Sequence, residues 1–190
     1  RRGIRHVFGL CGHTNIAVLS AMAGSTIQFI NVRHEQVAAH AADGYARVTN
    51  QAAVVLTHLG PGLTNAATGV ANAALDCIPM VVIAGDVPSH YFGKHPHQEV
   101  NLHADASQFE IFRPIVKRAW RVDKPTLLPE ILEKAFQLAQ SSQPGPVLVD
   151  GRHGVRRAGR LEPACAAGKR RQQELVGANH DDRHTDTHRH

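Results

Sequence analysis

One carboxylate stands out among the residues whose type and position could carry chemistry. Glu35 lies in the stretch NVRHEQVAAHAADGYARVT (residues 31–49), where a hydrophobic run gives way to an alanine-rich helical pattern. A carboxylate at the carboxyl end of a strand, partly removed from water, can exchange a proton with a bound group. A glutamate in the first turn of a helix is also explained by the helix macrodipole, which stabilises it by about 0.3–1 kcal/mol. The local sequence alone favours the helix-start role.

A second feature is the glycine-rich turn in GPGLTN (residues 60–65), which opens a helical pattern. Backbone N–H groups at such a turn attract anions. The turn lacks the lysine of a phosphate loop and does not match GxGxxG. Thr64 and Asn65 could cap the helix, contact a ligand, or do both. Turn formation and ligand contact therefore remain open as equal alternatives.

Histidine is abundant, but its spacing predicts no metal site. The first 150 residues contain nine histidines without HExxH or comparable ligand spacing, and the three cysteines of the chain form no CxxC pair. Ordinary hydrogen bonding is the expected role of each histidine. The nine are His6, His13, His34, His40, His58, His90, His95, His97 and His103.

The elements that must position these residues alternate along the chain up to about residue 150. Short apolar runs predict strands at 4–10, 26–32, 52–59, 79–85, 115–122 and 146–151. Helical patterns lie near 14–23, 35–49, 62–76, 104–112 and 126–141. This alternation predicts an α/β fold: a doubly wound, mainly parallel sheet of about six strands with helices on both faces. The polar segment 86–101 is expected to be a long loop, where ligands of such sheets bind.

The net charge of +5 is concentrated at the end of the chain. Residues 151–190 carry nine Lys/Arg and five Asp/Glu, a balance of +4, which leaves +1 for residues 1–150. The folded part therefore has no field that would attract nucleic acid. Residues 1–150 predict one domain, and residues 151–190 a basic, His-rich tail that is disordered or aberrant.

Nothing in the sequence indicates a membrane protein. No apolar run reaches the roughly 18 residues that a bilayer span needs, and the chain opens without a signal-peptide pattern. The composition, 43% hydrophobic and 19% charged, is ordinary for a folded α/β domain. A cytoplasmic protein is the resulting expectation.

Six motifs occur together in residues 3–150, in a fixed order. They are VFGLCG (7–12), VRHEQVAAHAADGYAR (32–47), GPGLTNAATGVANA (60–73), DCIPMVVIAGDVP (76–88), HQE (97–99) and PGPVLVD (144–150). In this combination the chain resembles the N-terminal, pyrimidine-binding (PYR) domain of thiamine diphosphate-dependent enzymes, and among them the large subunit of acetolactate synthase. The resemblance implies a domain that lacks the first helix of its relatives.

The resemblance reverses the preference for Glu35. It implies that this carboxylate hydrogen-bonds N1′ of the cofactor's aminopyrimidine, in an enzyme that decarboxylates a 2-keto acid and transfers the resulting C2 unit. It also implies cofactor contacts at the turns around the pyrimidine and an active-site loop near the thiazolium and substrate. The implied cofactor-binding residues are Gly12, Glu35, His58, Gly60, Pro61, Gly62 and Asn65, and Gln98 is the implied loop residue.

Two departures from the family pattern affect the expected reaction. Cys11 stands where many relatives have proline, and His58-Leu59 stands where acetolactate synthases commonly have Thr-Ser. His58 is therefore expected to bring to the cofactor a ring that many relatives lack. The substrate and the reaction branch do not follow from the sequence.

The family's diphosphate and magnesium site belongs to a separate C-terminal domain, and its FAD site to a central domain. The resemblance thus implies half a cofactor site, with Mg2+ and any FAD outside this chain, and a partner diphosphate-binding domain in a homo- or hetero-oligomer. A fragment inactive alone is the first hypothesis. A PYR subunit of a two-chain 2-keto acid decarboxylase and a non-catalytic interaction module are the alternatives.

Overall fold

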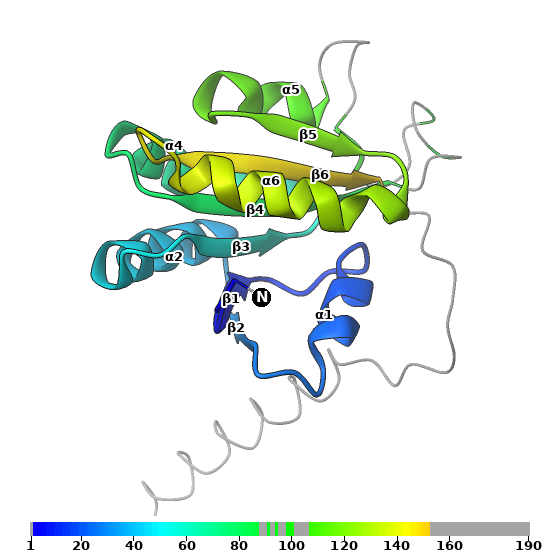
Figure 1. The fold of residues 1–190 in the computed structure, drawn as a ribbon. Helices are drawn as coiled ribbons and strands as arrows, with labels where there is room; N and C mark the ends of the chain where they lie inside the picture. Colours follow the sequence, from blue (N-terminus) through cyan, green and yellow to red (C-terminus); the bar gives the residue numbers. More distant parts are fainter. Residues whose placement is uncertain (1, 88–90, 92–93, 95–97, 101–106, 153–190) are drawn as a thin grey trace, which may run out of the picture.

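The computed structural model is built around one sheet of six parallel strands (Figure 1). It describes residues 2–87, 91, 94, 98–100 and 107–152. The strands follow the order β2-β1-β3-β4-β6-β5 across the sheet, and each neighbouring pair is parallel. They are β1 (His6–Gly9), β2 (Gln28–Asn31), β3 (Ala53–Thr57), β4 (Met80–Asp86), β5 (Ala119–Val122) and β6 (Pro146–Arg152).

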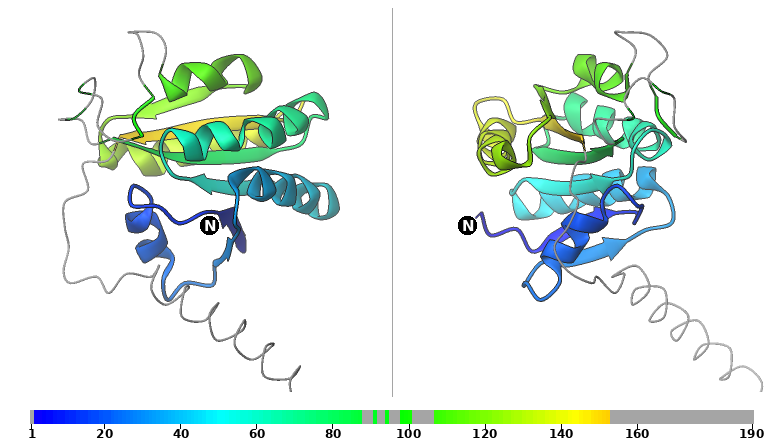
Figure 2. Two further views of the ribbon diagram at one scale, coloured as in Figure 1. Left: turned by 180° about the vertical axis from the view of Figure 1, so that it is seen from behind. Right: turned by 90° about the vertical axis from the view of Figure 1, so that its right-hand side faces the viewer.

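Helices cover both faces of this sheet (Figure 2). They are α1 (Ile16–Met22), α2 (Glu35–Thr49), α3 (Pro61–Asn65), α4 (Ala67–Leu75), α5 (Gln108–Phe112) and α6 (Leu128–Gln140), with 3-10 turns at Arg113–Ile115 (η1) and Pro125–Leu127 (η2). Alternate strand residues face opposite layers. Val55 packs among α2 and α4, while Val54 and Leu56 pack against α1. The predicted doubly wound α/β fold is therefore confirmed.

Some predicted elements differ in their bounds. The pattern at 62–76 is divided into α3 and α4, because the Ala66 N–H bonds to the Leu63 carbonyl, one residue short of an α-helical bond. The run at 115–122 forms a strand only from Ala119, and its first residue, Ile115, ends the 3-10 turn η1. Of the predicted helix 104–112, residues 104–106 lie outside the described residues, and α5 begins at Gln108, with Ser107 as its N-cap. The predicted tail lies outside the described residues from 153 onward.

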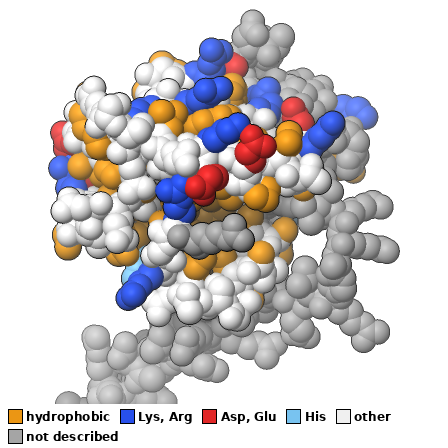
Figure 3. Space-filling model, in the orientation of Figure 1, with side chains coloured by type: hydrophobic (Ala, Val, Ile, Leu, Met, Phe, Trp, Pro, Cys, Tyr) orange, Lys and Arg blue, Asp and Glu red, His pale blue; other side chains and the backbone are white. Residues whose placement is uncertain are grey.

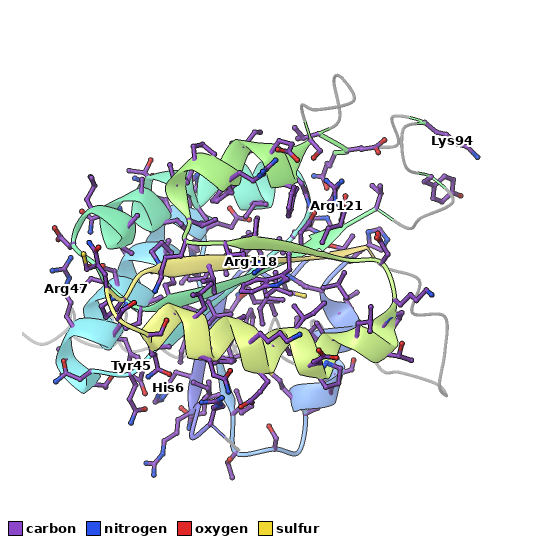
Figure 4. All side chains as sticks on the ribbon, turned by 45° about the horizontal axis from the view of Figure 1, so that its top comes forward. His6, Tyr45, Arg47, Lys94, Arg118 and Arg121 are labelled. Atoms are coloured by element: carbon purple, nitrogen blue, oxygen red, sulfur yellow. The ribbon has the colours of Figure 1, made fainter. Side chains whose placement is uncertain are left out.

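Helix α2 is fixed at both ends and against its neighbour. The His34 ring caps its start by accepting the Gln36 N–H at 3.2 Å, and Asn50 ends it in a left-handed conformation (φ 53°). Arg47 bonds to Asp43 on α2 and to Asp76 just after α4, and the two carboxylates hold the pKa of Arg47 above its ordinary value (Figure 4). These contacts align α2 with α4.

Charged side chains of both signs are interspersed on the face seen in Figure 3. On α6, Lys134 pairs with Glu130 at 2.5 Å, and Glu133 pairs with Arg2. No helix within the described residues is both long and apolar enough to cross a membrane.

Candidate functional site

The predicted site residues gather at the carboxyl ends of β1, β2 and β3. In the sheet, β1 and β3 are neighbours, while the chain leaves β1 toward β2 on one side and leaves β3 toward β4 on the other. The strand order thus reverses between β1 and β3, which is where open α/β sheets form a ligand crevice. Gly12 follows β1, Glu35 follows β2 and His58 follows β3.

Glu35 is the first residue of α2, and it is only 4% exposed. Its Oε2 accepts a hydrogen bond of 3.0 Å from Asn65 Nδ2 at the end of α3. A buried carboxylate needs such a donor to offset its loss of hydration. The bond also fixes the rotation of the carboxylate, so that the direction of Oε1 is set by Asn65.

The second oxygen of Glu35 lies close to the backbone of Gly62, where there is no room for a larger side chain. A Cβ at Gly62 would lie 3.2 Å from Glu35 Oε1 and 3.1 Å from His58 Cβ. On the other side of the histidine, a Cβ at Gly12 would lie 2.4 Å from His58 Cγ. The structure therefore brings Gly12, Glu35, His58, Gly62 and Asn65 into one cluster.

The His58 ring is held by Thr14. Its Nδ1 lies 2.6 Å from Thr14 Oγ1 and 3.4 Å from the Thr14 backbone nitrogen. A backbone N–H can only donate, so Nδ1 is assigned as the acceptor and the neutral ring carries its proton on Nε2. The ring of His13 packs edge-on against it, with centroids 5.8 Å apart. His58 is thus oriented as a side chain whose Nε2 donates.

The start of the glycine turn meets the segment that carries Gln98. Gly60 has a φ of +51°, and a Cβ there would lie 2.0 Å from the Gln98 carbonyl oxygen. Both the conformation and this contact require glycine. Gln98 itself is a non-glycine residue with φ +68°, and it is exposed, as is Pro61 at the first position of α3. The structure joins Gln98 to the turn through its backbone.

Two residues of the cluster were not singled out by the sequence. Thr14 orients His58, and the buried side chain of Gln108 accepts the Gly60 N–H at 2.5 Å. A sequence motif could not have indicated either residue, because each forms its contact with a residue more than 40 positions away in the chain. The polar pair Thr14-Asn15 shortly after the apolar run 4–10 was the one available indication.

Four predicted hydrogen-bonding histidines, His90, His95, His97 and His103, lie outside the described residues. Within the part of the chain that the structure describes, no group of three or more His, Cys, Asp or Glu side chains could hold a metal ion.

Comparison with known proteins shows which family the chain is similar to. Residues 1–108 match the family model described as "Thiamine pyrophosphate enzyme, N-terminal TPP binding domain". The chain is 44% identical over 154 residues to the acetolactate synthase of Arthrospira platensis, in a match that covers 79% of this chain and 26% of that protein. It is 45% identical over 150 residues to the acetolactate synthase large subunit of Buchnera aphidicola from Acyrthosiphon pisum (78% and 25%). It is 42% identical over 150 residues to the isozyme 3 large subunit of Escherichia coli K12 (78% and 25%). The chain thus spans about a quarter of the length of these curated relatives.

Proposed function

The chain belongs to the thiamine pyrophosphate enzymes, as their N-terminal TPP-binding domain, and from this premise we propose that the cluster around Glu35 receives the aminopyrimidine of thiamine diphosphate. The observation that carries the proposal is the buried carboxylate of Glu35, which lies where the strand order reverses and is oriented by Asn65. A flat ring bearing nitrogen atoms needs a polar partner in its plane, and Glu35 would supply it. Glycine at positions 12 and 62 leaves room for the His58 side chain next to this carboxylate.

In this proposal Glu35 holds or releases a proton at N1′ of the pyrimidine. Asn65 keeps the carboxylate oriented through its 3.0 Å bond, so that the proton moves along one direction. His58 is held next to the carboxylate, because its Nδ1 contacts Thr14 Oγ1 at 2.6 Å. When bound, thiamine diphosphate supplies the electron sink that decarboxylation of a 2-keto acid requires.

The proposed reaction follows that of the named relatives, acetolactate synthases: decarboxylation of a 2-keto acid and transfer of the C2 unit. Because the chain spans about a quarter of their length, the diphosphate and Mg2+ are assigned to a domain outside it, in another chain or in a longer form of this one. FAD, where an enzyme of this type requires it, would likewise be bound outside this chain, in a central domain. The active unit is then an oligomer or a longer chain.

The half-site proposal predicts a weak interaction with the cofactor for the chain alone. Titration calorimetry of the 190-residue chain with thiamine diphosphate and Mg2+ is expected to show no binding, or a Kd above about 100 μM, because the diphosphate lacks its partners. The control is a chimera in which residues 2–152 replace the matching quarter of the Arthrospira platensis enzyme, and it is expected to bind. Micromolar or tighter binding by the chain alone would refute the half-site proposal.

The close approach of Gly62 to Glu35 gives a second prediction. In the chimera, Gly62→Ala is expected to raise the half-saturating concentration of thiamine diphosphate at least about tenfold, since its methyl group would lie 3.2 Å from Glu35 Oε1 and displace the carboxylate. Gly62 is helical and has no positive φ, so alanine strains no backbone angle, and only a small fall in the thermal midpoint is expected from the tight contacts. Activity measured against cofactor concentration, with Gly44→Ala as the control in open space, tests this. Equal half-saturation in both variants would contradict the proposed position of the pyrimidine.

A further inference from the structure

The side chain of Gln108 is buried at the centre of a hydrogen-bond network next to the proposed site. It is 1% exposed and lies at the start of α5. Its Oε1 accepts the Gly60 N–H at 2.5 Å, and its Nε2 donates to the Gly85 carbonyl at 3.0 Å and to Asp150 Oδ1 at 2.7 Å. One amide thus connects the glycine turn to the ends of β4 and β6.

The chemistry of these partners fixes the orientation of the amide. The Gly85 carbonyl and the Asp150 carboxylate only accept hydrogen bonds, so the NH2 group must face them and the oxygen must face Gly60. Asp150 also forms an ion pair with Arg121 on β5, in which its Oδ2 lies 3.8 Å from Arg121 Nε. If the amide were flipped, its NH2 group would face the Gly60 N–H, and two hydrogen-bond donors would lie opposite each other. Only one arrangement therefore satisfies every group.

The backbone of Gln108 fixes a second part of the site. Its N–H donates to the Val100 carbonyl at 3.0 Å, in the segment 98–100. That segment meets the turn directly, because the Gln98 carbonyl oxygen occupies the position where a side chain of residue 60 would begin. Gln108 thus holds the turn through its side chain and the Gln98 segment through its backbone.

We propose that Gln108 is a positioning residue that sets the Gly60–Gly62 turn relative to Gln98 and to Glu35. Its hydrogen bonds go to Gly60, Gly85, Asp150 and Val100, and it acts on the turn through the Gly60 N–H. The inference rests on the proposed function, since the turn and Gln98 are the parts assigned to the cofactor and the substrate. Without the amide, the Gly60 N–H and Asp150 Oδ1 each lose a buried partner, and the turn is expected to shift.

The first test is NMR on the full 190-residue chain and needs no cofactor. In the wild type, the side-chain amide protons of Gln108 are expected to exchange with water at least about 100-fold more slowly than those of the exposed Gln137, because they are buried and bonded. In Gln108→Met, which conserves length, the Gly60 amide is expected to exchange at least about tenfold faster, while the Val55 and Leu148 amides are unchanged. The matched control is Gln137→Met.

Unprotected Gln108 amide protons in the wild type would overturn the proposal, even if Gln108→Met failed to fold. Unchanged Gly60 amide exchange in a folded Gln108→Met would also overturn it.

The second test uses the chimera. There, Gln108→Met is expected to raise the half-saturating thiamine diphosphate concentration about tenfold, and Gln137→Met is expected to leave it unchanged. Faster Gly60 exchange with unaltered cofactor dependence would show a purely structural role and overturn the positioning assignment. A chimera that binds no cofactor at all would refute the proposed function, whereas the exchange data would still decide whether Gln108 holds the turn.

Discussion

Replacing Glu35 by Gln is expected to lower turnover of the chimera by about 100- to 10,000-fold, the range typical for removal of a general acid–base group. Gln has nearly the same shape as Glu and can still bond to Asn65, which donates to Glu35 Oε2 at 3.0 Å. It cannot exchange a proton with N1′ of the pyrimidine. Steady-state release of CO2 from pyruvate, at saturating cofactor, measures the effect.

The matched control for this substitution is Glu130→Gln on the exposed surface of α6. It removes the same charge far from the cluster, so full activity is expected. The thermal midpoint of Glu35→Gln should stay within a few degrees of the parent chimera, which separates lost chemistry from lost fold. If Glu35→Gln retained decarboxylase and carboligase activity, the catalytic assignment would be wrong, and the interaction-module alternative would be favoured.

The architecture was predictable because its determinants are local. Continuous apolar runs such as AAVVLTHL and PMVVIAG indicate strands buried on both faces, and β3 and β4 are almost entirely buried. The start of α2 followed from the change of pattern at Glu35. Once the order of alternating elements was known, the carboxyl ends of the strands were the expected position of a site.

The detailed contacts of the site were not predictable, because they join residues that are distant in the sequence. The role of Asn65 depends on Glu35 thirty positions earlier, and that of Gln108 on Gly60, Gly85 and Asp150. Local physics favoured a helix-start role for Glu35, and the structure gives it that place while Oε1 also lies close to the backbone of Gly62. The two roles are compatible, because a first-turn carboxylate at a strand end lies at the crevice.

The contact between α2 and α4 gives a large expected effect on stability. A Cβ at Gly69 would lie 2.5 Å from Ala39 Cβ and 3.2 Å from the Ala39 carbonyl carbon, and Ala39 is fully buried. Gly69→Ala should therefore lower the free energy of unfolding by about 2 kcal/mol, because overpacking exceeds the gain of about 1 kcal/mol in helix propensity. For a chain of this size the thermal midpoint should fall by about 4–8 °C, as measured by calorimetry or circular dichroism.

Gly44→Ala is the matched control, since it lies on α2 with open space around its Cα, and it should raise stability by about 0.5–1 kcal/mol. A double variant that combines Ala39→Gly with Gly69→Ala restores the room between the helices. It should recover most of the loss, apart from the cost in helix propensity of a glycine on α2, which is about 1 kcal/mol. An unchanged midpoint in Gly69→Ala would mean that the helices are not in close contact.

The same contact between α2 and α4 also affects the proposed site. Helix α2 carries Glu35, and α4 follows shortly after Asn65. Forcing the two helices apart should therefore break the Glu35–Asn65 hydrogen bond and lower the turnover of the chimera together with its stability.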